Sequence, residues 1–473
     1  MQESDSNVKG ARSEASGLPA LIRGTVCHVK GSPFALADDS DVLEWFEDGA
    51  LAIDGSGRIA GTGHFEDLRA KHSGYAVIDR QGCLILPGMV DGHIHYPQAL
   101  MIGAFGEQLL TWLDKYTFPE EAKYEDEAYA KEAARIFFGE LIAHGTTTAL
   151  IFGAHFEKAT ALAFEEANRR RFRALIGMSL ADRNIRPSLR LDPESAYQAC
   201  GRLIADWHNK DKLRFVVTPR YAPTCSEEMF SVCRRLMLEH PDIIVQTHIS
   251  ENLDEIAWIK ELYPAESSYL DVYDRRGLVG PRTVLAHSVH SSDEEICRIQ
   301  EAEASVVHCP SSNCFMGSGL MPLGKYVDRG IKVALGTDIA GGTGYSLFQE
   351  MNQAYKVQML RLFAFGDKNH AVKLSGEKLL YLATLGGATA LGLEGEIGNF
   401  KPSKYADFLV IDPGLDDYFS ARLKNTSTMS EKLFVLATMG SKELIREVYL
   451  DGVLEHPSPG PYKCRSQADN ADD

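Results

Sequence analysis

Apolar runs alternate with amphipathic stretches through the middle of the chain. Between residues 84 and 394, an apolar, strand-like run is followed by a helical segment eight times. Segments such as 124–144 and 158–171 carry apolar residues at three- and four-residue spacing, as the buried face of a helix does. The expected strands are 84–94, 146–152, 174–181, 213–218, 243–249, 283–288, 304–308 and 331–337. Eight such units predict an α/β fold, a (β/α)₈ (TIM) barrel, whose functional groups gather at the carboxyl ends of its strands.

The two ends of the chain have a different pattern. Residues 20–83 and 396–455 contain short alternating runs separated by Asp-Gly and glycine-rich turns, which favour strands and hairpins. We expect these two parts to join into one small β-sandwich. The predicted organisation is a disordered start, the first part of the sandwich, the barrel, the second part of the sandwich and a disordered polar tail, at 1–18, 19–85, 86–394, 395–456 and 457–473.

The composition narrows the class of function. The 473 residues carry a formal net charge of −17, which argues against binding to nucleic-acid backbones and to anionic membranes. No apolar run approaches the roughly 18 residues that span a bilayer, and residues 1–18 lack the apolar centre of a secretory signal. Nine cysteines are scattered without a C-x₂-C pair, which favours reduced thiols and a cytoplasmic protein.

Side chains that bind divalent metals stand at the ends of the predicted strands. His93 and His95 lie at the end of the first strand, and alternate residues of a strand face the same side, so both imidazoles would point into the barrel mouth. His248, His287 and Asp338 stand at the ends of the fifth, sixth and eighth strands. Imidazole nitrogen and carboxylate oxygen are ligands that suit Zn²⁺. These residues predict a metal centre assembled from distant parts of the chain.

Each of these residues also has a structural interpretation. A single histidine after a buried strand is more often a hydrogen-bonded core residue, and Asp338 could cap the segment that follows it. The metal-site interpretation is favoured because four histidines stand at strand ends, two of them in one H-x-H pair. Glu251, three residues after His248, offers a carboxylate for proton transfer beside the metal. It could instead be a first-turn helix residue, favoured there by the helix dipole.

The end of the fourth strand limits the number of metal ions. Two-metal hydrolases of this architecture usually bridge their ions with a modified lysine from that strand. Here the strand ends Thr218-Pro219-Arg220, with no lysine at the equivalent place. One ion is therefore the better prediction, with His287 contacting the nucleophilic water at least as much as the ion.

Several motifs together carry a resemblance to a known family. They are LPGMVDGHIH at 86–95, THISEN at 247–252, LAHS at 285–288, HCPSSN at 308–313 and LGTDIAGG at 335–342. With them the chain resembles the amidohydrolase superfamily, in its purine and pyrimidine deaminase branch. Four stretches narrow the resemblance to the guanine deaminases, at 95–98, 112–119, 218–221 and 309–313. The similarity runs from about residue 20 to residue 455, and WLDKYTFPEE at 112–121 is its most specific part.

The resemblance implies an activity and a site. It implies a hydrolase of C–N bonds in cyclic amidines that converts guanine to xanthine and ammonia in purine catabolism, as a homodimer. One Zn²⁺ would be held by His93, His95, His248 and Asp338, with His287 completing the site. The residues expected to contact guanine are His95, Gln98, Arg220, Tyr221, His248 and Glu251. The residues expected to be catalytic are Glu251, Asp338 and His287.

One position departs from the family pattern, and two other functions stay open. Tyr221 stands where the family usually has Phe, a change that an aromatic ring stacked on a purine would survive. The chain could instead be a deaminase or chlorohydrolase acting on another purine, a pyrimidine or a triazine. A non-catalytic scaffold on the same fold is a third reading, but such proteins lose their metal ligands, whereas this chain keeps each candidate.

Overall fold

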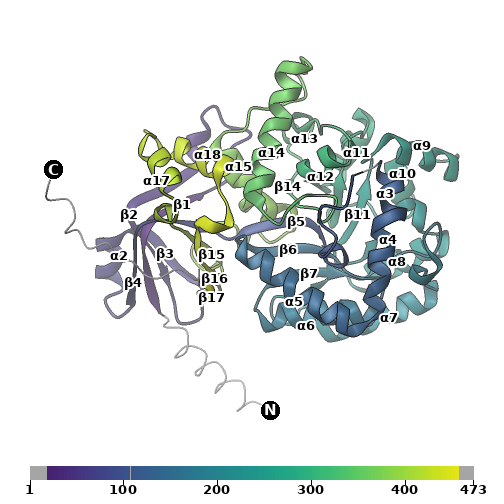
Figure 1. Ribbon diagram of the computed structural model, residues 1–473, viewed down its shortest axis with the longest axis horizontal. Coiled ribbons are helices and arrows are strands. Elements are labelled where there is room, and N and C mark those ends of the chain that lie inside the picture. The colour runs from purple at the N-terminus through teal and green to yellow at the C-terminus, as the bar shows by residue number, and fades with distance from the viewer. Residues whose placement is uncertain (1–18, 107, 458–473) are drawn as a thin grey trace, which may run out of the picture.

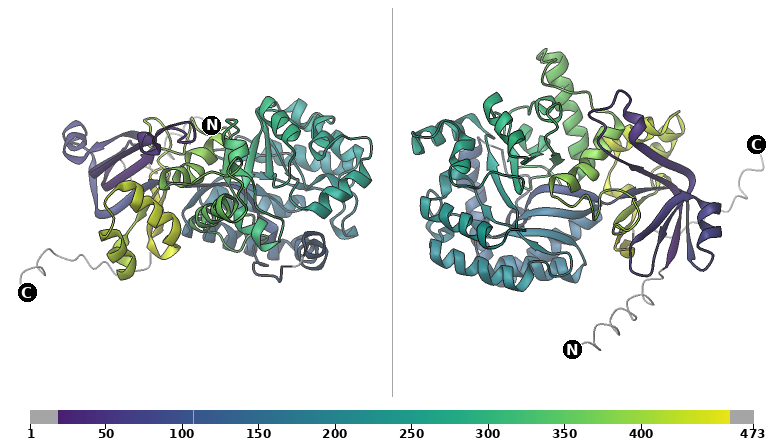
Figure 2. Two further views of the ribbon diagram at one scale, coloured as in Figure 1. Left: turned by 90° about the horizontal axis from the view of Figure 1, so that it is seen from above. Right: turned by 180° about the vertical axis from the view of Figure 1, so that it is seen from behind.

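The computed structural model describes residues 19–106 and 108–457, in two parts. Figure 1 shows a small sheet that combines purple strands from the start of the chain with yellow strands from its end. Beside it lies a larger part in which helices surround shorter strands, and both views of Figure 2 keep this division. The predicted disordered segments fall outside the described residues, apart from Pro457, which ends the last strand.

The small part is built on one seven-stranded sheet with the strand order β17-β16-β15-β4-β1-β2-β3. Its strands are β1 (Ala20–Val29), β2 (Leu43–Ile53), β3 (Ile59–His64), β4 (Ala76–Pro87), β15 (Phe408–Ile411), β16 (Ile445–Leu450) and β17 (Val453–Pro457). The two chain ends therefore join, as expected. They do so within a single sheet, and the second, facing sheet of a sandwich stays a prediction.

Alternating side chains of β1 bury both faces of this sheet. Ile22 and Val26 belong to an apolar cluster that also contains Phe408 of β15. Leu21 points into a second cluster, which helix α2 (Phe65–Lys71) completes with Phe65 and Leu68. This is the side-chain period of two that a strand imposes, here with apolar groups on both sides.

Strand β4 joins the two parts of the molecule. Its last residues, Leu84–Pro87, pair antiparallel with β15. After Gly88, strand β5 (Met89–His95) begins the larger part. The expectation of one barrel strand over 84–94 was therefore wrong at its start, because a continuous apolar run does not show where one sheet ends and the next begins.

The larger part contains the predicted parallel strands in the predicted order. Two four-stranded parallel sheets have the orders β5-β6-β7-β9 and β11-β12-β13-β14, and β8 pairs with β10. The strands after β5 are β6 (Thr146–Phe152), β7 (Arg173–Gly177), β8 (Ser179–Leu180), β9 (Arg214–Phe215), β10 (Thr218–Pro219), β11 (Val245–Ile249), β12 (Thr283–His287), β13 (Ser305–His308) and β14 (Val333–Leu335). A parallel bridge between Val217 and Val245 lies between the two sheets. The α/β, TIM-barrel-like architecture is confirmed, and complete closure of the strands stays a prediction.

Helices follow these strands and cover them from outside (Figure 1). The longer ones are α5 (Glu127–Ala143), α6 (Glu157–Arg169), α7 (Pro193–Trp207), α8 (Glu227–Glu239), α9 (Leu253–Leu262), α11 (Asp293–Glu301), α14 (Leu347–Met359) and α15 (Gly376–Ala383). Two more, α17 (Asp417–Lys424) and α18 (Met429–Met439), connect β15 to β16 of the small sheet. Shorter helices are α3 (Leu109–Trp112), α4 (Phe118–Glu121), α10 (Tyr269–Asp274), α12 (Pro310–Phe315), α13 (Leu323–Val327) and α16 (Leu385–Ala390).

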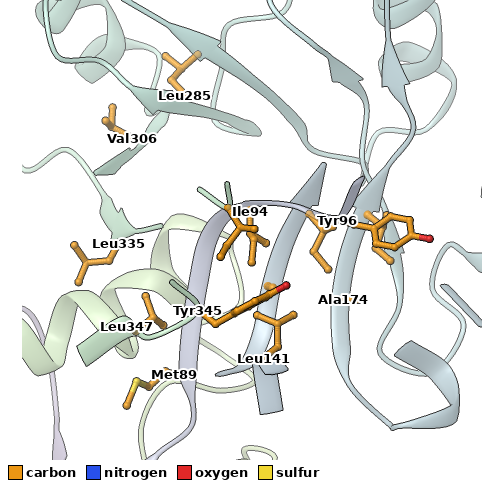
Figure 3. Close-up of a cluster of buried hydrophobic side chains, with 14 of the residues drawn as sticks. Met89, Ile94, Tyr96, Leu141, Ala174, Leu285, Val306, Leu335, Tyr345 and Leu347 are labelled. Atoms are coloured by element: carbon orange, nitrogen blue, oxygen red, sulfur yellow. The ribbon is translucent and has the colours of Figure 1, made fainter. Parts of the chain in front are cut away.

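The apolar core fixes the direction in which β5 points its side chains. Ile94, between the two histidines of β5, lies in a large buried cluster with Leu141 of α5 and Tyr345 (Figure 3). Since neighbouring residues of a strand face opposite sides, His93 and His95 face away from this layer. The sequence pattern of one apolar residue between two histidines thus sets both imidazoles on the inner side.

Two further findings concern membrane crossing and cysteine pairing in the described residues. Over residues 19–106 and 108–457, none of the helices combines the length and hydrophobicity that a membrane crossing requires. The same ranges include eight cysteines, all of them free.

Candidate metal centre and active site

Three imidazoles and one carboxylate converge at the ends of the parallel strands. His93, His95, His248 and Asp338 each offer a ligand atom, and these atoms lie within 4.8 Å of one another. The Nε2 atom of His95 is 3.3 Å from that of His93 and 3.1 Å from that of His248. Asp338 Oδ1 is 3.2 Å from Nε2 of both His93 and His95. The structure thus brings together residues that are up to 245 positions apart in the sequence.

The local backbone holds the first and last strands together at this point. Asp338 N donates a hydrogen bond to His93 O at 2.9 Å. The buried carboxylate of Asp91 accepts from the backbone nitrogens of both His93 and Thr337 at 3.1 Å. A Cβ on Gly336 would stand 2.9 Å from the Cβ of His93, so this contact requires glycine. Side chains of the first and eighth units meet because their backbones touch here.

Strand ends around the centre turn through the left-handed region of backbone conformation. The φ angles are 47° at Ser250, 72° at His287 and 47° at Asp338. These residues end or follow β11, β12 and β14. Residues other than glycine adopt this region infrequently, and such positions concentrate at functional sites. The backbone conformation therefore indicates a functional site at these strand ends, independently of their side chains.

Two of the histidines, His248 and His287, are held by one ring nitrogen and present the other. His248 Nδ1 donates to the backbone oxygen of Arg220 at 2.6 Å, and His287 Nδ1 donates to Asn313 Oδ1 at 2.9 Å. Metal-binding histidines are usually oriented in this way by a hydrogen bond to their second nitrogen. The alternative of a hydrogen-bonded core histidine accounts for one nitrogen of each ring and leaves the convergence of the Nε2 atoms unexplained.

The electrostatics of the four groups fit a bound cation. Burial lowers the pKa of the imidazoles, to about 4 at His95 and well below the usual value at His248, so their nitrogens keep free lone pairs. Burial would raise the pKa of Asp338, but the neighbouring His93 and His95 hold it well below its usual range. Lone pairs facing one another at 3.1–3.3 Å repel unless a positive charge lies between them. This donor set of nitrogen and oxygen suits Zn²⁺.

A cavity opens directly beside this cluster. The empty space there, part of it open to solvent, measures about 460 Å³. Its lining includes three histidines and an aspartate, His95, His248, His287 and Asp338. It also includes Gln98, Arg220, Tyr221 and Glu251. All the residues that the sequence suggested for substrate contact thus line one cavity.

Glu251 lies in this cavity as a buried carboxyl group, beside His287. Its Oε2 is 3.5 Å from His287 Nε2, and its Oε1 accepts from Ser318 Oγ at 2.9 Å. Burial, and then the charge of Asp338, raise the pKa of Glu251 to about 8. A carboxyl group with this pKa carries a proton at neutral pH and can donate it.

The alternative interpretation of Glu251 as a first-turn helix residue was wrong. Helix α9 begins at Leu253 with Asn252 as its N-cap, so Glu251 precedes the helix. The acidic residue that closes the capping box is Glu255, which accepts hydrogen bonds from the backbone nitrogens of Glu251 and Asn252. Glu255 therefore fixes the backbone that carries Glu251.

Arg220 is a buried residue whose ion pair lies inside the protein. Its side chain is 3% exposed, and its Nη1 donates to both carboxylate oxygens of Glu121 at 2.9 Å. Its guanidinium also lies 5.3 Å from the centre of the Phe118 ring. Tyr221, the next residue, is buried and lies edge-on to Trp258. The structure places both residues at the cavity after strand β10.

Sequence reasoning missed Glu121, which connects two of the cavity residues. Gln98 Nε2 donates to Glu121 Oε1 at 3.0 Å, and His155 Nε2 lies 3.3 Å from Glu121 Oε2. Glu121 ends the segment 112–121, in which a π-helical turn (Leu113–Thr117) separates α3 from α4. That segment stood out as the most specific part of the resemblance, but nothing in the sequence showed which of its two adjacent glutamates turns inward.

Comparison with families of known proteins places the chain in one of them. The model of the amidohydrolase family matches residues 84–453. The guanine deaminase of Escherichia coli (strain K12) is 42% identical in sequence, over 92% of this chain and 97% of its own length. The solved structure of the E. coli guanine deaminase covers 92% of this chain and 99% of its own, with a TM-score of 0.87.

Two further solved structures agree with this placement. The guanine deaminase from Bradyrhizobium japonicum is 34% identical, with a TM-score of 0.88 over 93% of this chain and 99% of its own. The guanine deaminase from C. acetobutylicum, solved with bound guanine in its active site, is 32% identical, with a TM-score of 0.84 over 92% of this chain and 99% of its own. The chain therefore belongs to the amidohydrolase family, and within it to the guanine deaminases.

Proposed function

We propose that this protein removes the 2-amino group of guanine by hydrolysis and releases xanthine and ammonia. The observation that carries the proposal is the composition of one cavity, which joins the His/Asp cluster and Glu251 to the donor groups of Arg220 and Gln98. The sequence relationship supports it, since a guanine deaminase matches 92% of the chain and another relative holds guanine in its active site.

The polar groups of the cavity suit guanine better than adenine. Arg220 can only donate hydrogen bonds, so it suits the carbonyl oxygen at C6 of guanine and opposes the amine that adenine carries there. Gln98 can both donate and accept, which suits a ring N–H or a ring nitrogen. A site built around such a hydrogen bond discriminates strongly, because the wrong base leaves a buried group unpaired. The ring of Tyr221 would stack on the purine.

The metal centre would hold one Zn²⁺ through His93, His95, His248 and Asp338, with His287 beside it. When bound, zinc supplies hydroxide at neutral pH by lowering the pKa of water, and it polarises the reacting bond. The ligand assignment rests on the convergence of these atoms within 4.8 Å and on their charge state.

The chain's own groups would then carry the protons of the reaction. Asp338 accepts a proton from the attacking water, and the free Nε2 of His287, 3.7 Å from Asp338 Oδ2, orients that water. Oxygen bonds to C2 while Glu251, protonated at neutral pH, gives its proton to ring N3. Glu251, now ionised, takes the proton of the new C2 hydroxyl and passes it to the 2-amino group as the C2–N bond breaks and ammonia leaves. The proton held by Asp338 then returns to Glu251. The single hydrogen bond from Ser318 to its Oε1 leaves Oε2 available for these transfers.

The proposal is tested by measuring ammonia release from a panel of bases with metal-loaded protein. Guanine should be converted to xanthine, seen by its ultraviolet spectrum, with the highest kcat/KM of the panel. Adenine, cytosine, a chlorotriazine and 2,6-diaminopurine should be poor substrates or none. A protein that preferred one of these to guanine would instead be a related deaminase or chlorohydrolase, and a protein inactive on all of them would be a scaffold.

Replacing Arg220 with alanine should raise KM for guanine while the bound metal stays at its full amount. Losing a charged hydrogen bond costs about 1.5–3 kcal/mol, which corresponds to about a 10- to 100-fold weaker binding. The change also leaves the buried Glu121 carboxylate without its positively charged partner, so the melting temperature should fall. Steady-state kinetics together with metal analysis check this, and unchanged guanine kinetics would remove Arg220 from the substrate site.

We further propose, on the resemblance to the family, that the enzyme works in purine catabolism in the cytoplasm, as a homodimer with one zinc per subunit. The division into residues 19–85, 86–394 and 395–456 is likewise proposed, with its first boundary inside strand β4, together with the small sandwich and a closed barrel. Gel filtration at defined concentrations tests the dimer.

A further inference from the structure

Glu121 is the most strongly engaged buried carboxylate beside the cavity. Its side chain has no exposed surface. Arg220 Nη1 donates to both of its oxygens, Gln98 Nε2 donates to Oε1, and His155 Nε2 lies against Oε2. Burial would raise the pKa of Glu121, but Arg220 and then His155 lower it to about 2, so the group is ionised. The two side chains assigned to guanine recognition, Arg220 and Gln98, thus share one anchor.

Glu121 determines which way the amide of Gln98 faces. A carboxylate only accepts hydrogen bonds, so the atom of Gln98 that lies 3.0 Å from Glu121 Oε1 must be its NH₂ group. The backbone N–H of Ala340 can only donate, and it bonds the other end of the same amide, Oε1, at 3.0 Å. With both ends fixed, Gln98 presents one remaining N–H and one remaining lone pair in a defined arrangement.

Glu121 also cancels the positive charge of Arg220. The two side chains are 0% and 3% exposed and bond at 2.9 Å, so they form a buried pair without net charge. A single buried guanidinium would favour an anionic ligand, because its charge would be unpaired in a medium of low polarity. The neutralised pair keeps donor groups but no excess charge, which suits a neutral ligand with a carbonyl oxygen.

We propose that Glu121 is a positioning and specificity-determining residue, which sets Arg220 and Gln98 for a neutral, carbonyl-bearing base. It acts through these two residues and not on the reacting atoms. The inference rests on the proposed function, because it assigns to Arg220 and Gln98 the recognition of the base. It adds a residue that the sequence did not identify and a reason why the cavity excludes bases with an amine at C6.

The test is Glu121→Gln, compared with Glu120→Gln as a matched control. The glutamine places an NH₂ group where two donors converge, Arg220 Nη1 with either Gln98 Nε2 or His155 Nε2, so at least one of them must move. Glu120, its neighbour on α4, is also mostly buried but bonds Tyr129 and Lys123 and does not line the cavity. Glu121→Gln should raise KM for guanine about 10- to 100-fold, the range for a lost charged hydrogen bond, with a smaller loss in kcat. Discrimination between guanine and 2,6-diaminopurine, which has an amine at C6, should fall, while Glu120→Gln changes neither.

Two further variants separate positioning from general damage to the fold. Glu121→Asp keeps the charge with a side chain one methylene shorter, and its KM should lie between those of the wild type and Glu121→Gln. In an Arg220→Ala background, Glu121→Gln should raise KM by a smaller factor than in the wild type, because only its action through Gln98 remains and residues that act through each other are not additive. Metal content and melting temperature are measured for every variant.

Three results would overturn the inference. One is a Glu121→Gln protein with the KM and base discrimination of the wild type. Another is an effect of Glu121→Gln that is equally large with and without Arg220. The third is a Glu121→Asp protein as impaired as Glu121→Gln. Failure of the proposed function looks different, because then the wild-type protein itself would not release ammonia from guanine.

Discussion

Replacing Glu251 with glutamine should slow ammonia release from guanine by about 10²–10⁴-fold, the range for a positioned acid–base group. Glutamine keeps the size of the side chain and can keep the contact with Ser318 Oγ. Its amide cannot give up a proton to a ring nitrogen or to a departing amine. Because Glu251 lies outside the cluster of four metal-ligating atoms, the metal should stay bound. Steady-state kinetics and metal analysis of the same preparation measure both effects.

Glu295→Gln is the matched control for this substitution. Glu295 is also a mostly buried glutamate near the start of a helix, where it closes the capping box of α11, and it does not line the cavity. Losing one capping bond should cost stability of about 1 kcal/mol and leave kcat unchanged. Near-normal turnover of Glu251→Gln with full metal content would show that another group moves the protons.

The metal centre was predictable because the two-residue period of a strand determines which side chains share a face. His93 and His95 flank Ile94, and the packing of Ile94 in the outer apolar layer forces both imidazoles to the inner side. Parallel strands of one α/β unit bring their carboxyl ends to the same edge, so His248, His287 and Asp338 had to approach this pair. Both inferences need only the directions of the strands and of their side chains. These follow from the alternation of residue types within a strand and from the order of strands and helices along the chain.

The recognition side of the cavity was only partly predictable. Glu120 and Glu121 are adjacent, equally charged and both mostly buried. Which of them meets Arg220 depends on the rotation of α4, and that is set by the π-helical turn before it. A π-turn shifts the helix face by one residue, and sequence patterns do not mark such turns. For the same reason no pattern connected Gln98, Arg220 and His155 to one carboxylate.

The junction of the two parts escaped prediction for a different reason. Residues 84–90 form one run without a polar side chain, yet Leu84–Pro87 pair with β15 of the small sheet and the strand that begins at Met89 pairs with β6. Apolarity reports burial and not the identity of the partner strand. Only Gly88, where a Cβ would stand 2.1 Å from Thr147 Oγ1, marks the crossing point.

Removing the metal with a chelator should abolish ammonia release, and adding Zn²⁺ back should restore it. The three imidazoles and the aspartate supply the only metal-ligating group of this kind among residues 19–106 and 108–457. Mg²⁺ should not restore activity, because it prefers all-oxygen ligands. Zinc should also raise the melting temperature, since an ion that binds only the folded protein stabilises it, by an amount that grows with the free ion concentration.

The amount of zinc at full activity should be one ion per chain. A second ion would need a bridging ligand from the fourth strand, but Arg220, the side chain that follows β10, is bound to Glu121 and has no lone pair to offer a metal. Metal analysis during stepwise addition of Zn²⁺ measures this directly. Activity that rises until two ions are bound, or a metal-free protein that still deaminates guanine, would contradict a single-ion centre. Activity that saturates at one ion would agree with the four converging ligand atoms, which form a single ion site.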